Sequence, residues 1–285
     1  MNKRHSIRKM HKYPVKLDVN KVIREKAPDA FVPQFLINWL KRIICQDELN
    51  RILEYAGNAE GHVFAQKALE YFDIKLNIIG SENIPTEGKF IFASNHPLGG
   101  LDGVALAAFL GKQFDGKIRI QVNDILMNVT NLEPIFLPVN KHGGQAKDAI
   151  RKTNEAYISD NQLLVFPSGL CSRKQQGKIR DLRWKKAFIV KALEFNRSII
   201  PIYFNEVNST FFYNLSSLRK KLGIKANIEM LFLPKEMFKK KNATFTIYIG
   251  KPITFDYFDK SKTHQEWANY VEDIVYRTGK NYNER

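Results

Sequence analysis

The chain has 285 residues, of which 44% are hydrophobic and 26% charged, so it is long enough to bury a core and is not expected to be disordered. Its 45 Lys and Arg residues outnumber 29 Asp and Glu residues, and the net charge of +16 favours an anionic partner. The two cysteines, Cys45 and Cys171, have no metal-ligand spacing, which predicts a reducing, cytoplasmic compartment and excludes a disulfide scaffold.

The N-terminal region, residues 1–74, is predicted to be a basic arm followed by a helical cap that associates with membranes. Residues 1–26 carry nine Lys or Arg against two acidic residues. Apolar residues at 32, 35, 36, 39, 40 and 43 then follow one helical face. This stripe fits either packing on the core or an interfacial helix on anionic lipid. A second helical stretch is expected at about 47–72.

No membrane-spanning or secretory segment is expected. The basic N-terminus is not followed by the apolar core of a signal peptide. No stretch reaches the roughly 18 to 20 apolar residues that a spanning helix needs. A membrane-associated protein of this sequence would therefore lie on the bilayer.

From residue 75 the pattern changes to short β-branched runs that alternate with helical segments. This predicts an α/β domain over 75–285, with a mixed, mostly parallel sheet flanked by helices. Ligands of such sheets sit beyond the strand ends. Helices are expected at about 146–157, 184–195 and 263–277. Strands are expected at 76–79, 89–93, 117–122, 135–139, 162–166, 198–204, 227–233 and 244–250.

The segment SNHPLGGLDG, residues 94–103, follows a predicted strand and sets His96 and Asp102 on either side of two glycines. Gly99 and Gly100 allow a sharp turn, so Asp102 can bond one ring nitrogen of His96 and leave the other as a proton acceptor. A general base requires this arrangement. The alternative is a structural His beside an Asp that only caps the next helix.

SNHPLGGLDG resembles the first motif of the glycerolipid acyltransferases, the family that contains lysophosphatidic acid acyltransferase. In that family a His and an Asp form a relay at the start of a helix. Segments similar to the later motifs follow in the family's order, and the resemblance covers about residues 75–255. These segments are FLPVNK (136–141), FPSGLCSR (166–173), IIPIYF (199–204) and IGKPI (249–253).

The resemblance implies a glycerol-3-phosphate acyltransferase-like fold and an O-acyltransferase. A fatty acyl group would pass from a thioester of acyl carrier protein or coenzyme A to the hydroxyl of a lysolipid acceptor. His96 would be the general base and Asp102 would orient it. Neither a cofactor nor a metal is implied. The expected location is the cytoplasmic face of an anionic membrane, as a peripheral protein.

The sequence departs from the family pattern at the acceptor motifs. Five residues separate His96 from Asp102, whereas the family usually has four. The third motif has Ser168, Leu170 and Cys171 where the family has Glu, Thr and Arg. Those family residues are associated with holding a glycerol phosphate. The departures favour a different acceptor, such as a lyso-aminolipid of the ornithine or glycine type, with lysophosphatidate as the alternative.

Substrate-binding residues are expected around these motifs. Seven Lys or Arg residues fall within 173–186, and Arg173 could clamp a phosphate or carboxylate, although a solvated basic loop is the alternative. Gly99, Gly100 and Gly169 are candidate backbone donors to the oxyanion of the reaction. The expected set is Asn95, Gly99, Gly100, Lys141, Ser168, Gly169, Ser172, Arg173, Lys185 and Lys186.

Other functions compete with this interpretation. Ser168 lacks the Gly-x-Ser-x-Gly setting of a serine hydrolase. A nucleic-acid-binding protein would match the charge and the 12% aromatic content, but no nucleic-acid motif is present and no nucleic-acid partner is expected. A third alternative is an acyltransferase fold that binds lipid without catalysis. Basic runs at 219–225 and 239–241 could face headgroups or an acidic carrier protein.

Overall fold

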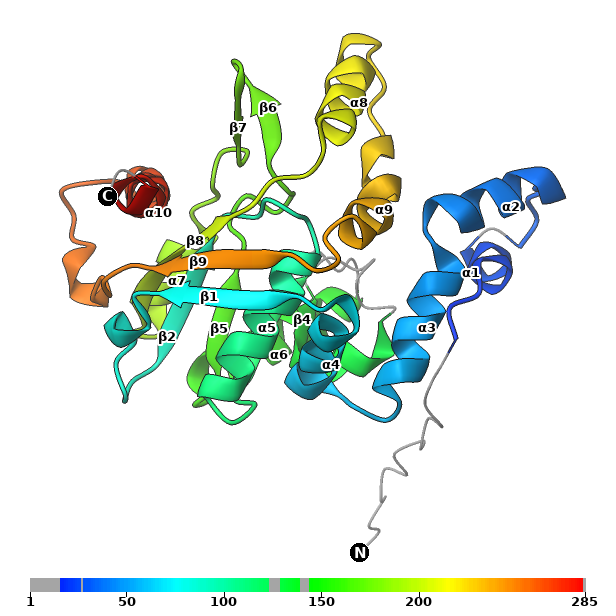
Figure 1. Ribbon diagram of the computed structural model, residues 1–285. Coiled ribbons are helices and arrows are strands. Elements are labelled where there is room, and N and C mark those ends of the chain that lie inside the picture. The colour runs from blue at the N-terminus through cyan, green and yellow to red at the C-terminus, as the bar shows by residue number, and fades with distance from the viewer. Residues whose placement is uncertain (1–15, 27, 123–128, 139–143, 284–285) are drawn as a thin grey trace, which may run out of the picture.

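The structure is a computed structural model, and it describes residues 16–26, 28–122, 129–138 and 144–283. In these residues seven strands form one sheet in the order β1-β9-β8-β2-β5-β3-β4 (Figure 1). Strands β8 and β9 pair antiparallel, and the other neighbours are parallel, which confirms the predicted mixed sheet. The strands are β1 (Lys75–Ile79), β2 (Phe90–Ser94), β3 (Ile118–Val122), β4 (Phe136–Pro138), β5 (Gln162–Val165), β8 (Ser198–Asn205) and β9 (Thr244–Ile249).

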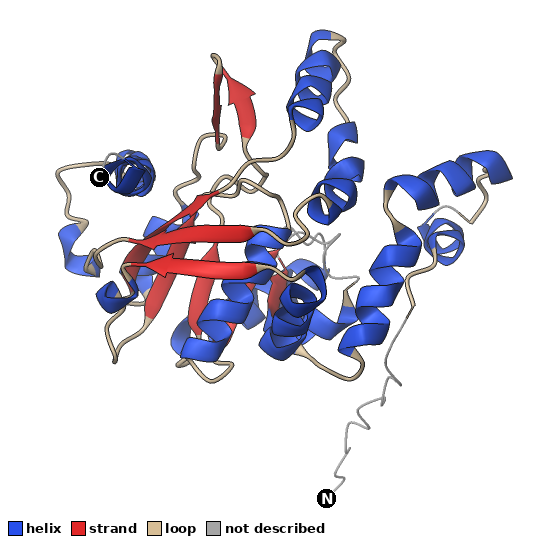
Figure 2. Cartoon of the chain, in the orientation of Figure 1, coloured by secondary structure: helices blue, strands red, loops and turns tan. Residues whose placement is uncertain are grey.

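Strand β2 is central and is covered on both faces, which explains its unbroken apolar sequence. Phe90 and Phe92 pack into one hydrophobic layer, and Ile91 and Ala93 into the other. Figure 2 shows helices on both sides of the strands. Helices α4 (Gly61–Phe72) and α5 (Leu101–Gln113) cover the first face. Helices α6 (Gly144–Ile158), α7 (Ala187–Glu194) and α10 (His264–Asn283) cover the second.

The N-terminal region contains α1 (Val19–Lys26), α2 (Gln34–Ile43) and α3 (Gln46–Ala56) before α4. The predicted helix at 47–72 is therefore two helices, because Gly57, at φ 57°, ends α3. Helix α4 packs on α5 and contributes to the core of the sheet. The division of the chain at residue 74 stays a prediction. Because α4 contributes to the core of the sheet, the separate cap would consist of α1, α2 and α3.

The apolar stripe on α2 does not pack on the core as a whole. Phe35 is 75% exposed and Trp39 is 50% exposed. Of the stripe, Ile43 is buried, and the other buried side chain of this helix is Ile37, which lies outside the stripe. Two aromatic rings are thus left on the outer face of α2.

One predicted strand is wrong. Residues 227–233 form a 3-10 helix, η4 (Ile228–Phe232), that leads into α9 (Leu233–Phe238). The run is apolar like a strand, but Glu229 within it is buried between Arg173 and Arg219, which lie outside the sheet. The structure adds α8 (Thr210–Lys221), a hairpin of β6 (Arg173–Gln175) and β7 (Lys178–Arg180), and 3-10 turns at Ser81–Asn83, Thr130–Ile135 and Phe255–Tyr257.

Candidate active site

The loop between β2 and α5, residues 95–100, is here called the catalytic loop. It brings His96 to the carboxyl end of the central strand, and Asp102 lies in the first turn of α5. The distance between His96 Nδ1 and Asp102 Oδ2 is 2.9 Å. Among the described residues, His96 Nε2 has no hydrogen-bond partner. The two side chains that the sequence analysis paired are therefore in contact, and the outer ring nitrogen is left available.

The catalytic loop closes around the buried carboxylate of Asp102, which explains how five intervening residues are accommodated. Oδ2 accepts hydrogen bonds from Leu98 N at 2.9 Å and Gly99 N at 3.3 Å. Oδ1 accepts from Gly100 N at 3.0 Å and Gly103 N at 2.9 Å. The N-cap of α5 is Gly100, and Asp102 lies in the first turn of the helix, so the capping alternative is wrong. Asp102 uses its oxygens to hold the catalytic loop and to contact the imidazole.

Only glycine fits at position 99 of the catalytic loop. Its φ of 75° lies in the left-handed region, and a Cβ there would lie 2.9 Å from both Cys171 Cβ and Leu233 Cδ1. The loop can therefore approach the third motif closely only without a side chain at this position.

Charges near the ring set its proton affinity. Burial opposes protonation of His96, but the Asp102 carboxylate and its hydrogen bond raise the pKa of His96 in net. Burial also opposes ionisation of Asp102, but His96 and the backbone donors leave the pKa of Asp102 below its usual value. Asp102 is therefore ionised, and a neutral His96 keeps its proton on Nδ1 with the lone pair on Nε2.

A second buried carboxylate, Asp181, holds the catalytic loop and was missed in the sequence. It accepts from His96 N with both oxygens at 3.2 Å, from Ser172 Oγ and from Trp184 Nε1 at 3.0 Å. Burial raises the pKa of Asp181. The signal was present, because Asp181 is the lone acidic residue among seven cations in 173–186.

The third motif packs on the same loop. Phe166 stacks on the His96 ring, with centroids 4.1 Å apart and planes at 28°. Ser172 N donates to His96 O at 2.8 Å. Phe166 therefore packs on the imidazole, and Ser172 holds the main chain of the same residue.

Comparison with known proteins shows the family of the chain. A family model described as acyltransferase matches residues 21–283. The chain belongs to this acyltransferase family. It is 49% identical to a lyso-glycine lipid O-acyltransferase of Bacteroides thetaiotaomicron over 92% of this chain and 97% of that protein. It is 47% identical to a lyso-glycine lipid O-acyltransferase of Phocaeicola vulgatus, over 92% and 94%.

Among solved structures, the chain is similar to the 1-acyl-sn-glycerophosphate (LPA) acyltransferase PlsC of Thermotoga maritima. The TM-score is 0.52 at 17% identity, over 93% of this chain and 89% of that one. At this identity the likeness shows the fold. The acyltransferase-like α/β fold expected from the motifs is therefore confirmed.

Several predicted substrate-binding residues of this acyltransferase have structural contacts instead. Asn95 is buried and bridges to β8, since Oδ1 accepts from Phe204 N at 2.7 Å and Nδ2 donates to Phe204 O at 3.0 Å. Ser168 Oγ donates to Leu170 O at 2.8 Å, and Ser172 Oγ donates to the carboxylate of Asp181. These side chains hold the site together.

The expectation that three glycines supply oxyanion donors is corrected by their hydrogen bonds. Gly99 N and Gly100 N already donate to Asp102, and Gly169 N donates to Phe166 O at 2.9 Å. Each N–H is used to shape a turn, so none is aimed at a substrate.

The predicted anion clamp, Arg173, is also corrected. Its side chain is 2% exposed, and its guanidinium donates to Glu229 Oε1 at 2.9 Å and to Cys171 O at 2.7 Å. Arg219 Nε donates to Glu229 Oε2 at 2.6 Å from the other side. Arg173 therefore belongs to a buried ionic cluster beneath the third motif, where a substrate phosphate has no access.

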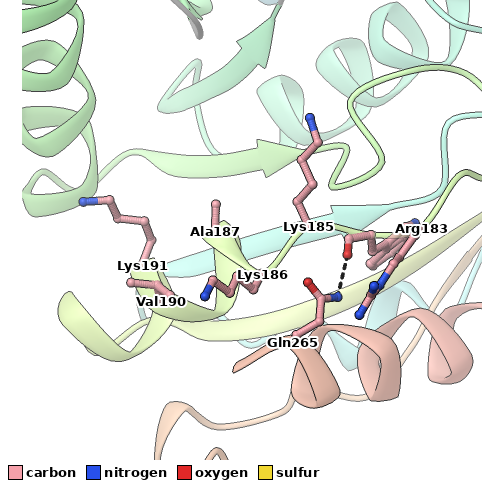
Figure 3. Close-up of a pocket in the computed structure, with 8 residues that line it drawn as sticks. Arg183, Lys185, Lys186, Ala187, Val190, Lys191 and Gln265 are labelled. Atoms are coloured by element: carbon pink, nitrogen blue, oxygen red, sulfur yellow. Dashed lines mark hydrogen bonds between the residues drawn. The ribbon is translucent and has the colours of Figure 1, made fainter. Parts of the chain in front are cut away.

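Lys185 and Lys186 are exposed but diverge from each other. Lys185 Nζ lies 3.3 Å from the position that a Cβ on Gly169 would take, next to the third motif. Figure 3 shows Lys185 extending away from Gln265, whose side chain donates to Trp184 O at 2.8 Å. A cavity of about 410 Å³ lies on this side. Its lining residues are Arg183, Trp184, Lys185, Lys186, Ala187, Val190, Lys191 and Gln265.

The remaining predicted substrate-binding residue, Lys141, lies outside the described residues. Within the part of the chain that is described, no group of three or more His, Cys, Asp or Glu side chains is placed to hold a metal ion. Over the same residues, no helix combines the length and apolar character needed to cross a bilayer.

Burial raises the pKa of the Cys171 thiol to about 11, so Cys171 is not a thiolate nucleophile near neutral pH.

Proposed function

We propose that this acyltransferase moves a fatty acyl group from a thioester to the hydroxyl of a lyso-aminolipid, with a lyso-glycine lipid as the first candidate acceptor. The observation that carries the chemistry is the 2.9 Å contact between His96 Nδ1 and Asp102 Oδ2, with Nε2 left as an acceptor. The acceptor class is supported by the two relatives of 47% and 49% identity, which are named for that lipid.

The proposed mechanism uses His96 as a general base. Nε2 takes the proton of the acceptor hydroxyl as its oxygen attacks the thioester carbonyl carbon. The tetrahedral intermediate collapses with loss of the thiolate, which then takes the proton from the imidazolium. Asp102 stabilises that cation, and such base catalysis typically contributes about 10²- to 10⁴-fold. A thiol with a pKa near about 8.5 leaves readily without a strong acid.

The third motif supports an acceptor without a glycerol phosphate. Ser168, Leu170 and Cys171 replace the residues that the family uses for that group, and Arg173 is enclosed in the core. A glycine headgroup joined through its nitrogen keeps a free carboxylate. Lys185, whose ammonium group approaches Gly169, is the cation that we assign to it.

The donor and the location follow from the same proposal. The thioester is carried by acyl carrier protein or coenzyme A. The protein lies on the cytoplasmic face of an anionic membrane, held by the basic arm and by the exposed rings of Phe35 and Trp39 on α2. Two features together give stable membrane binding where one alone is marginal.

The test is an acyl-transfer assay in detergent micelles. Purified protein receives acyl carrier protein or coenzyme A thioesters together with lyso-glycine lipid, lyso-ornithine lipid or lysophosphatidate. Transfer to the lyso-glycine lipid, with a raised KM for this acceptor in Lys185→Ala, is expected. Transfer only to lysophosphatidate would refute the proposed acceptor class.

A further inference from the structure

The segment between β8 and β9 contains α8, η4 and α9, and its inner face encloses the catalytic loop. Phe212 and Tyr213 are buried on this face and pack against Cys171 of the third motif. Asn208 Nδ2 donates to Pro97 O at 3.1 Å. Leu233 contacts the loop where Gly99 lacks a side chain. Segment 207–235 is therefore anchored on the active site.

The outer face of α8 carries large apolar side chains that are more than half exposed, although the Phe211 ring contacts Phe232 edge-on, with centroids 5.2 Å apart. Phe211 is 51% exposed, Leu218 is 54% exposed and Leu222, just after the helix, is 66% exposed. Spacings of seven and four residues place these three in one line along the helix. Val207, Ile224 and Leu231 are also exposed in this segment. Such a contiguous apolar surface on a folded protein marks an interaction site.

The exposed charged residues of segment 207–235 are all positive. Lys220, Lys221, Lys225 and Lys235 are exposed. The single acidic residue in 207–235, Glu229, is fully buried between Arg173 and Arg219. Apolar side chains flanked by cations, with no exposed carboxylate, are the composition of a surface that lies in the interface of an anionic bilayer.

The position of α8 in the molecule supports the same partner. Figure 1 shows α8 above the sheet, away from α4 and α6, and α2 at the right of the molecule beyond α3. Helix α2 presents the exposed rings of Phe35 and Trp39.

We propose that the outer face of α8, with the loop that follows it, is a second lipid-contact surface that seats the catalytic loop on an anionic bilayer. This inference rests on the proposed function for its purpose, since a lysolipid acceptor is itself a membrane component. Phe211, Leu218 and Leu222 enter below the headgroups, and the lysines contact lipid phosphates. An acidic carrier protein would satisfy the lysines but would leave three aligned apolar groups against a polar surface.

Vesicle flotation tests the inference with the full chain. The variant Phe211→Ser/Leu218→Ser/Leu222→Ser is compared with Val63→Ser/Ile150→Ser/Ile158→Ser, which removes three exposed apolar side chains from α4 and α6. Vesicles contain phosphatidylcholine alone or mixed with phosphatidylglycerol. The α8 variant should bind the mixed vesicles about tenfold or more weakly, and the control variant should bind like the wild type. Equal binding by the two variants would overturn the inference.

A charge variant, Lys220→Glu/Lys221→Glu/Lys225→Glu, separates lipid from protein partners. It should lose the preference for phosphatidylglycerol, since each lysine near the surface contributes about fivefold in affinity. Unchanged vesicle binding with a raised KM for acyl carrier protein would assign the surface to the carrier and refute the inference.

Acyl transfer in detergent micelles keeps the two proposals apart. Both α8 variants should retain the micellar activity and the Tm of the wild type, because their side chains lie outside the core. Loss of vesicle binding without loss of micellar activity supports the inference. Absence of transfer in the wild type would refute the proposed function and leave the vesicle result to stand alone.

Discussion

His96 obtains its charge environment from one carboxylate and its position from another. Asp102 contacts the ring directly and is held by four backbone N–H groups. Asp181 bonds the main chain of His96 and does not touch the ring in the described contacts. The two acids therefore predict different kinetic defects when each is replaced.

Replacing Asp102 with Asn should shift the pH profile as well as the rate. Neutral His96 is the active form, and Asp102 raises the pKa of His96, so wild-type kcat should rise with pH with a midpoint above the ordinary value of about 6.5. The variant loses this charge, so its midpoint should fall to lower pH, and its plateau should drop by about 10² or more. A pH–rate series in micelles measures both. A midpoint that stays in place would argue against contact between the two groups during turnover.

Replacing Asp181 with Asn should lower kcat without changing KM. The amide of Asn keeps one acceptor but turns an NH₂ group toward a donor, so the backbone of His96 loses its anchor. A small displacement of the base costs about tenfold to 10²-fold in kcat. Steady-state kinetics at saturating thioester checks this, with Tm measured in parallel. Equal kcat in a folded variant would show that Asp181 has no positioning role.

At the scale of elements, the ionic cluster of Arg173, Glu229 and Arg219 joins the hairpin, η4 and α8. Burial opposes ionisation of Glu229, but the hydrogen bond from Arg219 and the charges of both arginines hold its pKa below the usual range. The cluster fixes segment 207–235 against the third motif. Loss of the ionic cluster is therefore expected to loosen the segment that packs on the active site.

Glu229→Gln should destabilise the protein by about 3 to 5 kcal/mol, because two buried guanidinium groups lose their counter-ion. Thermal unfolding measures this as a clear fall in Tm. The matched control is Glu155→Gln, which breaks an exposed pair with Arg151 and should leave Tm nearly unchanged. Equal Tm values for the two variants would contradict a structural role for the cluster.

Short sequence patterns predicted the features that depend on burial or on residues close together in the chain. The central strands were predictable because both faces are buried, as at Ile91 and Phe92. The 2.9 Å contact of His96 with Asp102 was predictable because the two residues are only six positions apart and two glycines between them allow a sharp bend. The strand expected at 227–233 failed because Glu229 pairs with Arg173, 56 residues away.

The roles of single polar residues were less predictable for the same reason. Asp181 lies 85 residues from His96, and Asn95 lies 109 residues from its partner Phe204. Arg173 looked like an anion clamp because its counter-ion is distant in sequence. Spacing alone shows neither the partner of a buried charge nor the bonds that occupy a glycine N–H.

At the scale of the whole molecule, the exposed face of α2 is expected to hold the protein on membranes. Phe35→Ser/Trp39→Ser removes its two exposed rings and should weaken vesicle binding severalfold, since these side chains contribute only when they enter lipid. Flotation beside the wild type measures the change, with micellar activity retained. If the variant floats with vesicles as the wild type does, α2 does not contribute to membrane binding.

The central claim is that His96 removes the proton from the acceptor hydroxyl. The most direct measurement is the acyl-transfer rate of His96→Ala in micelles containing lyso-glycine lipid and an acyl thioester, with Tm and vesicle binding measured on the same sample. The account predicts a rate lower by about 10²- to 10⁴-fold, with folding and vesicle binding preserved. A folded variant that transfers acyl groups at the wild-type rate would contradict it.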